Sequence, residues 1–182
     1  MMKESIRVTN LCKDYGTFQL DNVSFTLPQG CIMGLIGENG AGKSTTLRLI
    51  LNLIRKDSGK VTIFGLDAEK EALKIKQQIG VVFDENFFHD VLRAKDLPAI
   101  LRPVYLNWDD RLYDSLCSRF HLPCEKKFKE YSRGMKMKLS IAAALAHHPR
   151  LLILDEATSG LDPVVRNEIL DLFRGVSEVH SG

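Results

Sequence analysis

The sequence lacks any long apolar run, which predicts a chain that does not span a membrane by itself. No stretch of its 182 residues approaches the ~20 apolar residues that a membrane-crossing helix needs. The first residues also lack the apolar segment of a signal peptide, because Lys3, Glu4 and Arg7 interrupt them. We therefore expect a cytoplasmic protein, and if it works at a membrane, a second chain must cross the bilayer.

Cysteine and net charge are also low, and each excludes a class of function. The four cysteines contain no C-x-x-C pair, and no histidine cluster completes a zinc pattern, so we expect reduced thiols: Cys12, Cys31, Cys117 and Cys124. There are 25 Lys and Arg against 23 Asp and Glu, a net charge of +2. Such a near-neutral net charge does not favour nucleic-acid binding, although local basic patches are compatible with it.

Three short apolar runs are present, at residues 31–36, 79–83 and 151–154. They are continuous rather than alternating, as in parallel strands that helices cover on both faces. Amphipathic helical patterns accompany them, with apolar positions at Leu47, Ile50, Leu51 and Ile54; Met135, Leu139, Ala142, Ala143 and Ala146; and Val165, Ile169, Leu172 and Phe173. Alternating strands and helices predict an α/β domain with a mainly parallel sheet.

Two regions depart from this alternation. The first 30 residues contain short β-like segments around Ile6 and Val8 and again from Leu20 to Leu27, which predict a small antiparallel sheet. Residues 94–130 are rich in helix formers and lack a strand run, which predicts a helical subdomain. We expect a single domain over residues 1–182.

The most specific motif matches G-x-x-x-x-G-K-[ST] and reads Gly37-Glu38-Asn39-Gly40-Ala41-Gly42-Lys43-Ser44-Thr45. Its glycines let the backbone curl so that several N–H groups face one point at the positive end of a helix dipole. We predict a nucleotide site in which Lys43 reaches the β- and γ-phosphates and Ser44 binds Mg²⁺. The alternative, a glycine-rich turn that matches by chance, is expected in roughly 1% or fewer of chains of this length.

Two carboxylates follow the last apolar run. Asp155, at the end of a buried parallel strand, can hold Mg²⁺ beside a phosphate loop. Glu156 can orient or deprotonate the attacking water, which is the work of a general base. The alternative is that both are ordinary loop carboxylates near a strand end, and the phosphate loop in the same chain counts against it.

Four motifs then occur in the order of the ATP-binding cassette ATPases: the phosphate loop, Tyr-Ser-Arg-Gly-Met at 131–135, residues 151–156, and Ser-Gly-Leu-Asp at 159–162. The sequence resembles this family over nearly its whole length, and within it is similar to bacterial exporter-type subunits. The resemblance implies a P-loop NTPase fold, ATP and Mg²⁺, and ATP hydrolysis that powers a separate membrane-spanning subunit. It also implies a peripheral location at the inner face of the cell membrane.

The resemblance assigns further residues to the nucleotide. Tyr15 stands where the family stacks an aromatic ring on adenine; the alternative is a plain tyrosine at a strand end. Ser132 and Gly134 would contact the γ-phosphate bound by a second subunit in a head-to-tail dimer, and Asp162 would join the two sites. Ser132 can equally be a simple helix cap, and both roles are compatible.

Two positions depart from the family pattern. The usual signature is L-S-G-G-Q, whereas Arg133 and Met135 replace its first glycine and its glutamine here, and Ser132 and Gly134 are kept. Asp84 stands where the family carries a glutamine that touches Mg²⁺ and the lytic water. A carboxylate can hold Mg²⁺ but cannot donate a hydrogen bond when ionised, so we assign Asp84 to this metal and catalytic position.

The family also leads us to expect one more strand and a switch histidine after the helix that Asp162 caps and Pro163 begins. His180 follows that helix without an apolar strand before it, and we do not accept it as the switch. We therefore expect a C-terminally truncated chain that hydrolyses ATP poorly.

Two other functions stay open beside the transporter motor. One is a soluble family member that acts on ribosomes or DNA, and the other is a nucleotide-binding module without catalysis. In the family the segment 84–93 meets the membrane-spanning subunit. Tyr105 and Trp108 either lie near that surface or pack in the core of the helical subdomain.

Overall fold

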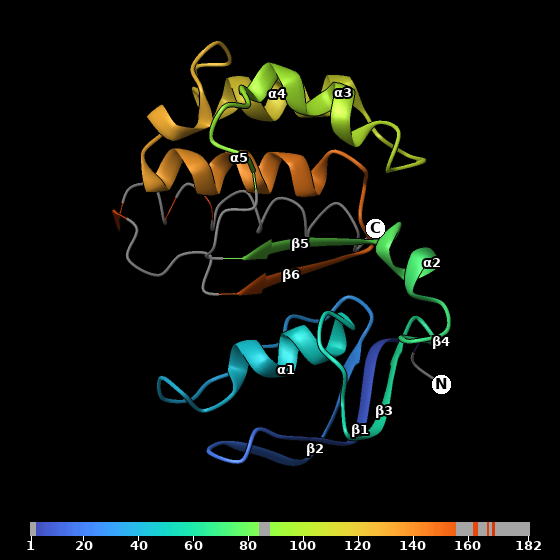
Figure 1. Cartoon of the computed structure of the whole chain (residues 1–182). Coiled ribbons are helices and arrows are strands. Elements are labelled where there is room, and N and C mark those ends of the chain that lie inside the picture. Colours follow the sequence, from blue (N-terminus) through green and yellow to red (C-terminus); the bar gives the residue numbers. More distant parts are fainter. Residues whose placement is uncertain (1–2, 84–87, 156–161, 164–166, 168, 170–182) are drawn as a thin grey trace. The chain divides into compact units, whose positions relative to one another are not determined.

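A computed structural model describes residues 3–83 and 88–155, together with Asp162, Pro163, Asn167 and Ile169. The chain divides into two units, Met1–Lys76 and Gln77–Gly182, which we call the N-terminal and the C-terminal unit (Figure 1). Each unit has its own sheet and its own helices.

The N-terminal unit is built on a four-stranded antiparallel sheet. Its strands are β1 (Glu4–Asp14), β2 (Gln19–Pro28), β3 (Ser58–Ile63) and β4 (Leu66–Asp67), in the order β2-β1-β3-β4. Strand alternation places Ile6 and Val8 in the core and leaves Arg7 exposed. Val8 pairs with Phe25 on β2 and with Val61 on β3, which confirms the antiparallel sheet expected from the first 30 residues.

Two helices complete this unit, α1 (Lys43–Ile50) and α2 (Ala72–Lys76). Ile50 of α1 and the following Leu51 are buried, as the apolar spacing predicted, whereas Leu47 is half-buried and Leu49, outside that spacing, is buried. The helix ends before Ile54, because Asn52 adopts the left-handed conformation with φ of 52°.

The strand expected over residues 31–36 is not formed. The segment has no ladder partner among the described residues, and Ile32 and Ile36 are 89% and 99% exposed. A continuous apolar run becomes a buried strand only where neighbouring strands pair with it and both faces are covered. The run belongs to the unit with the antiparallel sheet, whereas β5 and β6 belong to the other unit. The parallel sheet accordingly has two described strands rather than three.

The C-terminal unit contains that parallel pair, β5 (Ile79–Phe83) and β6 (Leu151–Asp155), in continuous register from Ile79–Leu151 to Phe83–Asp155. Helix α5 (Arg133–Leu145) packs against β5. Gly80 permits this close approach, since a Cβ at that position would lie 2.7 Å from the carbonyl oxygen of Ala144.

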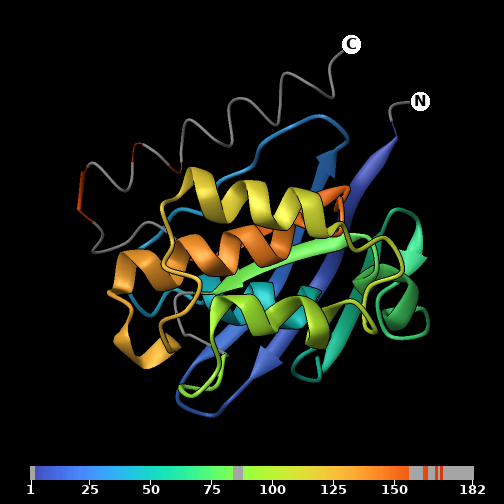
Figure 2. The same ribbon diagram turned by 90° about the horizontal axis from the view of Figure 1, so that it is seen from above.

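Residues 94–130 are helical, as the missing strand pattern predicted. They form the 3₁₀ turn η1 (Ala94–Asp96), helices α3 (Leu97–Leu101) and α4 (Asp110–Arg119), and the 3₁₀ turn η2 (Phe128–Glu130). Figure 2 shows α4 running alongside α5, and the two helices are in contact. Tyr113 on α4 is buried, and its hydroxyl donates a hydrogen bond to the carbonyl oxygen of Ala94 at 2.7 Å.

The apolar stripe predicted for α5 is buried from Leu139 to Ala146. The later helix begins at Pro163 as expected, and Ile169 is fully buried, while Val165, Leu172 and Phe173 lie outside the described residues. Within the part of the chain that the structure describes, no helix combines the length and the hydropathy needed to cross a bilayer.

Candidate functional site

The glycine-rich segment 37–42 forms a tight loop at the start of α1. Gly40 and Gly42 have φ of 86° and 89°, in the left-handed region that side chains rarely adopt. Gly42 is also the residue that precedes α1, and a Cβ there would lie 2.7 Å from the ring of Phe18. Position 42 therefore requires glycine for two reasons: its left-handed backbone conformation and the closeness of the Phe18 ring.

Lys43, the first residue of α1, reaches back over this loop. Its Nζ donates hydrogen bonds to the carbonyl oxygens of Gly37 at 2.9 Å and Glu38 at 3.0 Å. No side chain caps the start of helix α1. The backbone N–H groups of its first turn therefore face the loop, at the positive end of the helix dipole. An ammonium group and a helix N-terminus at one place form an anion site.

Tyr15 lies on the turn between β1 and β2, which contacts the same loop. The backbone N–H of Tyr15 donates to the carbonyl of Phe18 at 2.9 Å, and the Phe18 ring packs against Gly42. The Tyr15 ring is 50% exposed and has the ammonium of Lys13 5.4 Å from its centroid. The structure therefore brings together Tyr15 and the phosphate loop, two predicted parts of one nucleotide site.

Asp57 fixes the strand end that carries Tyr15. Its carboxylate accepts from Lys13 Nζ and from the N–H of Asp14, both at 2.7 Å, and these contacts hold the pKa of Asp57 below its ordinary value. Asp14 in turn accepts from the N–H of Gly16 at 2.6 Å, which closes the turn.

Asp155 lies at the carboxyl end of β6, paired with Phe83 of β5, and its side chain is buried. Because the two strands are parallel, their carboxyl ends at Phe83 and Asp155 lie at the same edge of the sheet. The predicted residues Asp84 and Glu156 lie outside the described residues. The structure thus shows that the ends of β5 and β6 are neighbours. The side-chain positions of Asp84 and Glu156 stay predictions.

Ser132 caps the N-terminus of α5, which is the simpler of its two predicted roles. Its Oγ accepts from the N–H of Met135 at 3.2 Å, and its own backbone is extended, with φ of −64° and ψ of 162°. Arg133 and Gly134 form the first turn of the helix, and Arg133 is exposed. The second predicted role, contact with a phosphate held by another subunit, stays a prediction.

The remaining predicted residues belong to the C-terminal unit. Asp162 is exposed and immediately precedes the helical Pro163. Tyr105 stacks on the buried ring of His147 with centroids 4.0 Å apart. Trp108 packs against the core and donates Nε1–H to Asp110 at 2.8 Å. Both aromatic residues are half-buried, and their position relative to a membrane-spanning subunit stays a prediction.

Phe18 is the residue at this site that sequence reasoning missed. It lies just before β2 and outside the motif, and no spacing rule connects it with Gly42, 24 positions later. Only the fold of the antiparallel sheet brings its ring to the loop. The signal that the sequence offered for Phe18 was an aromatic residue close to Tyr15.

A glycine turn with two left-handed residues, a lysine folded over it and an uncapped helix start define a phosphate-binding loop. This places the chain among the P-loop nucleotide-binding proteins. Residues 20–159 match the family described as "ABC transporter", and the chain belongs to that family.

Individual relatives agree with this assignment. "ABC transporter ATP-binding protein YtrB" of Bacillus subtilis is 40% identical over 87% of this chain and 54% of its own length. "Bacitracin transport ATP-binding protein BcrA" of Bacillus licheniformis is 36% identical over 97% of this chain and 59% of its own. A structure described as "Structure of ATP binding subunit of ABC transporter" matches with a TM-score of 0.83 at 26% identity, covering 95% of this chain and 75% of that chain. This chain therefore spans between 54% and 59% of the length of these two curated relatives.

Proposed function

We propose that this chain is the ATP-binding, ATP-hydrolysing part of an ABC transporter and powers a separate membrane-spanning subunit from the inner face of the cell membrane. The observation that carries the proposal is the phosphate loop, in which Lys43 reaches over the backbone turn that Gly42 makes possible. The names of the relatives support transport, since YtrB is called an ABC transporter ATP-binding protein and BcrA a bacitracin transport protein.

The N-terminal unit would bind the nucleotide. Backbone amides between Gly37 and Thr45 surround the β- and γ-phosphates, and Lys43 exchanges its two carbonyl partners for phosphate oxygens. Tyr15, exposed on the adjoining turn, stacks on the adenine ring. Asn39, Gly40 and Ala41 contribute through their backbone.

Mg²⁺ requires hard oxygen donors, and the chain offers them. Asp155 is a buried carboxylate at a parallel strand end, which fits a metal ligand better than an ordinary solvated loop residue. Asp155, Ser44 and Asp84 would hold the ion, with phosphate oxygens as further ligands. When bound, Mg²⁺ neutralises charge on the β- and γ-phosphates. Among the described residues no group of three or more His, Cys, Asp or Glu side chains is placed to hold a metal ion.

Glu156 would act as the general base that takes a proton from the attacking water. Ser132 and Gly134, at the start of α5, would contact the γ-phosphate held by a second copy or a second subunit, and Asp162 would lie at the same interface. The arrangement is a head-to-tail dimer with two nucleotides between its subunits.

Phosphate release by the wild type and by Glu156→Gln tests the enzymatic part of the proposal. Removing a general base costs about 10²–10⁴-fold in rate, and Mg-ATP binding by the variant is expected to persist. Equal rates for the two proteins contradict hydrolysis at this site. Co-purification with a membrane-spanning chain supports the transporter role, whereas co-purification with ribosomes or DNA supports the soluble alternative.

A further inference from the structure

Strand β3 does not reach the end of β1. The β1–β3 ladder stops at the pair Cys12–Ser58, whereas β1 continues to Asp14. Asp57, the residue before β3, extends the contact in another way. Its backbone N–H donates to the carbonyl of Cys12 at 3.0 Å, and its carboxylate accepts from the backbone N–H of Asp14 at 2.7 Å. A side chain therefore takes the place of a ladder partner at the last residue of β1.

The same carboxylate fixes the ammonium group of Lys13. Oδ1 of Asp57 accepts from Lys13 Nζ at 2.7 Å, while Oδ2 accepts from the backbone of Asp14. The Lys13 side chain is 18% exposed, so its stem lies against the protein and its charged end reaches Asp57. The bond from Lys13, followed by that from Asp14, lowers the pKa of Asp57 and keeps it ionised at neutral pH. One carboxylate thus holds two consecutive residues of β1.

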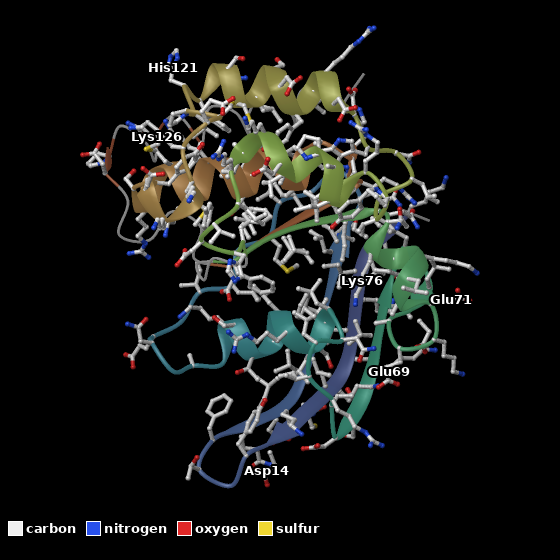
Figure 3. The ribbon with its side chains drawn as sticks, turned by 45° about the horizontal axis from the view of Figure 1, so that its top comes forward. Asp14, Glu69, Glu71, Lys76, His121 and Lys126 are labelled. Carbon is white, nitrogen blue, oxygen red and sulfur yellow. The ribbon has the colours of Figure 1, made fainter. Side chains whose placement is uncertain are left out.

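The ring of Tyr15, the residue after this strand end, receives the ammonium of Lys13. Nζ of Lys13 lies over the ring, 5.4 Å from its centroid, within the range of a cation–π contact. Figure 3 labels Asp14, which lies between these two residues in the chain, at the tip of the β1–β2 pair. An aromatic ring has two faces, and a cation held over one of them leaves the other for a flat partner.

Such an arrangement prepares the ring for stacking. An exposed tyrosine that samples several orientations loses that freedom when a base stacks on it, and this loss weakens binding. The ammonium that Asp57 holds restricts the Tyr15 ring before the nucleotide arrives. Lys13 and Asp57 together carry no net charge, so the pair adds little attraction for the triphosphate. Its effect should therefore appear in the affinity for the base rather than in the affinity for the phosphates.

We propose that Asp57 is a positioning residue for adenine, because it holds Lys13 over one face of the Tyr15 ring and so presents the opposite face to the base. The inference rests on the proposed function, since it deepens the account of the same nucleotide site. Asp57 acts through Lys13 and Tyr15 and contacts no part of the nucleotide itself. Its consequence is a preference for a nucleotide over a bare polyphosphate.

Calorimetric titration of the 182-residue chain with two ligands tests this role. One ligand is Mg-ATP, and the other is Mg-tripolyphosphate, which has three phosphates but neither base nor ribose. The first variant is Asp57→Asn, which removes the charge that binds Lys13 and keeps the size of the side chain. The second variant is Lys13→Gln, which removes the ammonium and leaves the bond between Asp57 and Asp14 in place.

Asp67→Asn, in the same unit, is the matched control. Asp67 also accepts two backbone N–H bonds, from Glu69 at 3.0 Å and from Lys70 at 3.2 Å, and they lower its pKa. Figure 3 labels Glu69 well away from Asp14. The control therefore removes an equally engaged carboxylate at a distance from Tyr15. Circular dichroism establishes that the variants fold, and if Asp57→Asn does not fold, Lys13→Gln decides by the same criteria.

Stacking of a base on an aromatic side chain contributes about 5–150-fold in affinity. The wild type and the control should therefore bind Mg-ATP more tightly than Mg-tripolyphosphate. Asp57→Asn and Lys13→Gln should weaken Mg-ATP binding by about 3–10-fold, a part of that factor, and leave Mg-tripolyphosphate binding unchanged. In a Tyr15→Ala background, Asp57→Asn should have no further effect on Mg-ATP, whereas a merely structural role predicts a loss for both ligands in both backgrounds.

The proposal is overturned if the wild type shows no preference for Mg-ATP, or if either variant leaves that preference unchanged or raises it. An equal loss for both ligands, or an effect of Asp57→Asn that persists without Tyr15, also overturns it. In each of these cases, wild-type binding of Mg-ATP leaves the proposed function standing. A wild type that binds neither ligand contradicts the proposed function and, with it, the role of Asp57.

Discussion

Gly42 combines a left-handed backbone with a close neighbour, and these two constraints can be separated by mutation. Gly40 has a similar φ of 86°, but a Cβ there meets nothing within 4 Å, whereas at Gly42 it would lie 2.7 Å from the Phe18 ring. Gly40→Ala is expected to lower the free energy of unfolding by about 1–3 kcal/mol through backbone strain. Gly42→Ala should cost about 1–3 kcal/mol more, because the added methyl group overpacks the contact.

Urea unfolding of both variants measures this difference. Equal costs for the two glycines would show that the Phe18 contact is unimportant. The double variant Gly42→Ala/Phe18→Ala serves as the control, since removing the ring should recover the part of the cost that comes from overpacking.

His147 makes folding sensitive to acid. It is buried at the end of α5, where its Nε2–H donates to the carbonyl of Ile79 at 3.0 Å and Tyr105 stacks on its ring. Burial, the largest cause, lowers the pKa of His147 below the ordinary value of 6.5, although the bond to Ile79 opposes this shift. The unfolded chain therefore binds the proton more tightly than the folded one. The stability that the neutral ring contributes is fully present above the unfolded pKa and is lost as pH falls through the folded pKa.

Unfolding free energies between pH 7.5 and 5, about the range over which an unperturbed histidine titrates, test this assignment. The wild type should lose stability toward the acidic end, and His147→Gln, which keeps an N–H donor, should show a smaller slope. His121→Asn is the matched control at an exposed histidine. A slope unchanged by His147→Gln would refute the role of this ring.

The sequence predicted those site residues that follow from a local rule. Lys43 and Gly42 belong to a motif with fixed spacing, and Ser132 precedes a helical pattern in the way that caps do. Phe18 and His147 acquire their contacts from chain segments 24 and 68 positions away, at Gly42 and Ile79. No periodicity in a single sequence records such pairs, so their roles needed the fold.

Among the elements, α5 depends most visibly on one side chain at its start. Ser132→Ala removes the hydrogen bond to the N–H of Met135 and should lower the free energy of unfolding by about 0.5–2 kcal/mol. Ser132→Asp keeps a cap and should retain most of the stability. Thermal or urea unfolding of the two variants distinguishes them, and an equal loss in both would argue against capping as the reason.

The sequence predicted correctly two of the three strands expected from apolar runs, together with the buried stripe of α5. Runs 79–83 and 151–154 became β5 and β6, and the stripe from Leu139 to Ala146 became the buried face of α5. Run 31–36 is also apolar but forms no strand, since pairing depends on neighbours that composition does not reveal. Apolar runs thus predict strands only together with their partners.

For the molecule as a whole, the proposed function draws on residues from both units. The phosphate loop and Tyr15 belong to the N-terminal unit, while Ser132, Asp155 and Asp162 belong to the C-terminal unit. The family and the class of fold could be predicted from four motifs in order, and residues 20–159 confirm the family. The division into two units could not be predicted from the sequence, because no linker-like composition marks the boundary near Lys76.

The central claim is that the loop at Gly42 and Lys43 captures the polyphosphate of ATP, and calorimetric titration with Mg-ATP tests it most directly. The folded wild type should bind, and Lys43→Ala should weaken binding by about 10–150-fold, the effect of one charge-assisted hydrogen-bonding group. Lys60→Ala, at an exposed lysine of the same unit, should bind as the wild type does. No heat of binding for the wild type, or equal affinities for Lys43→Ala and Lys60→Ala, would contradict the account.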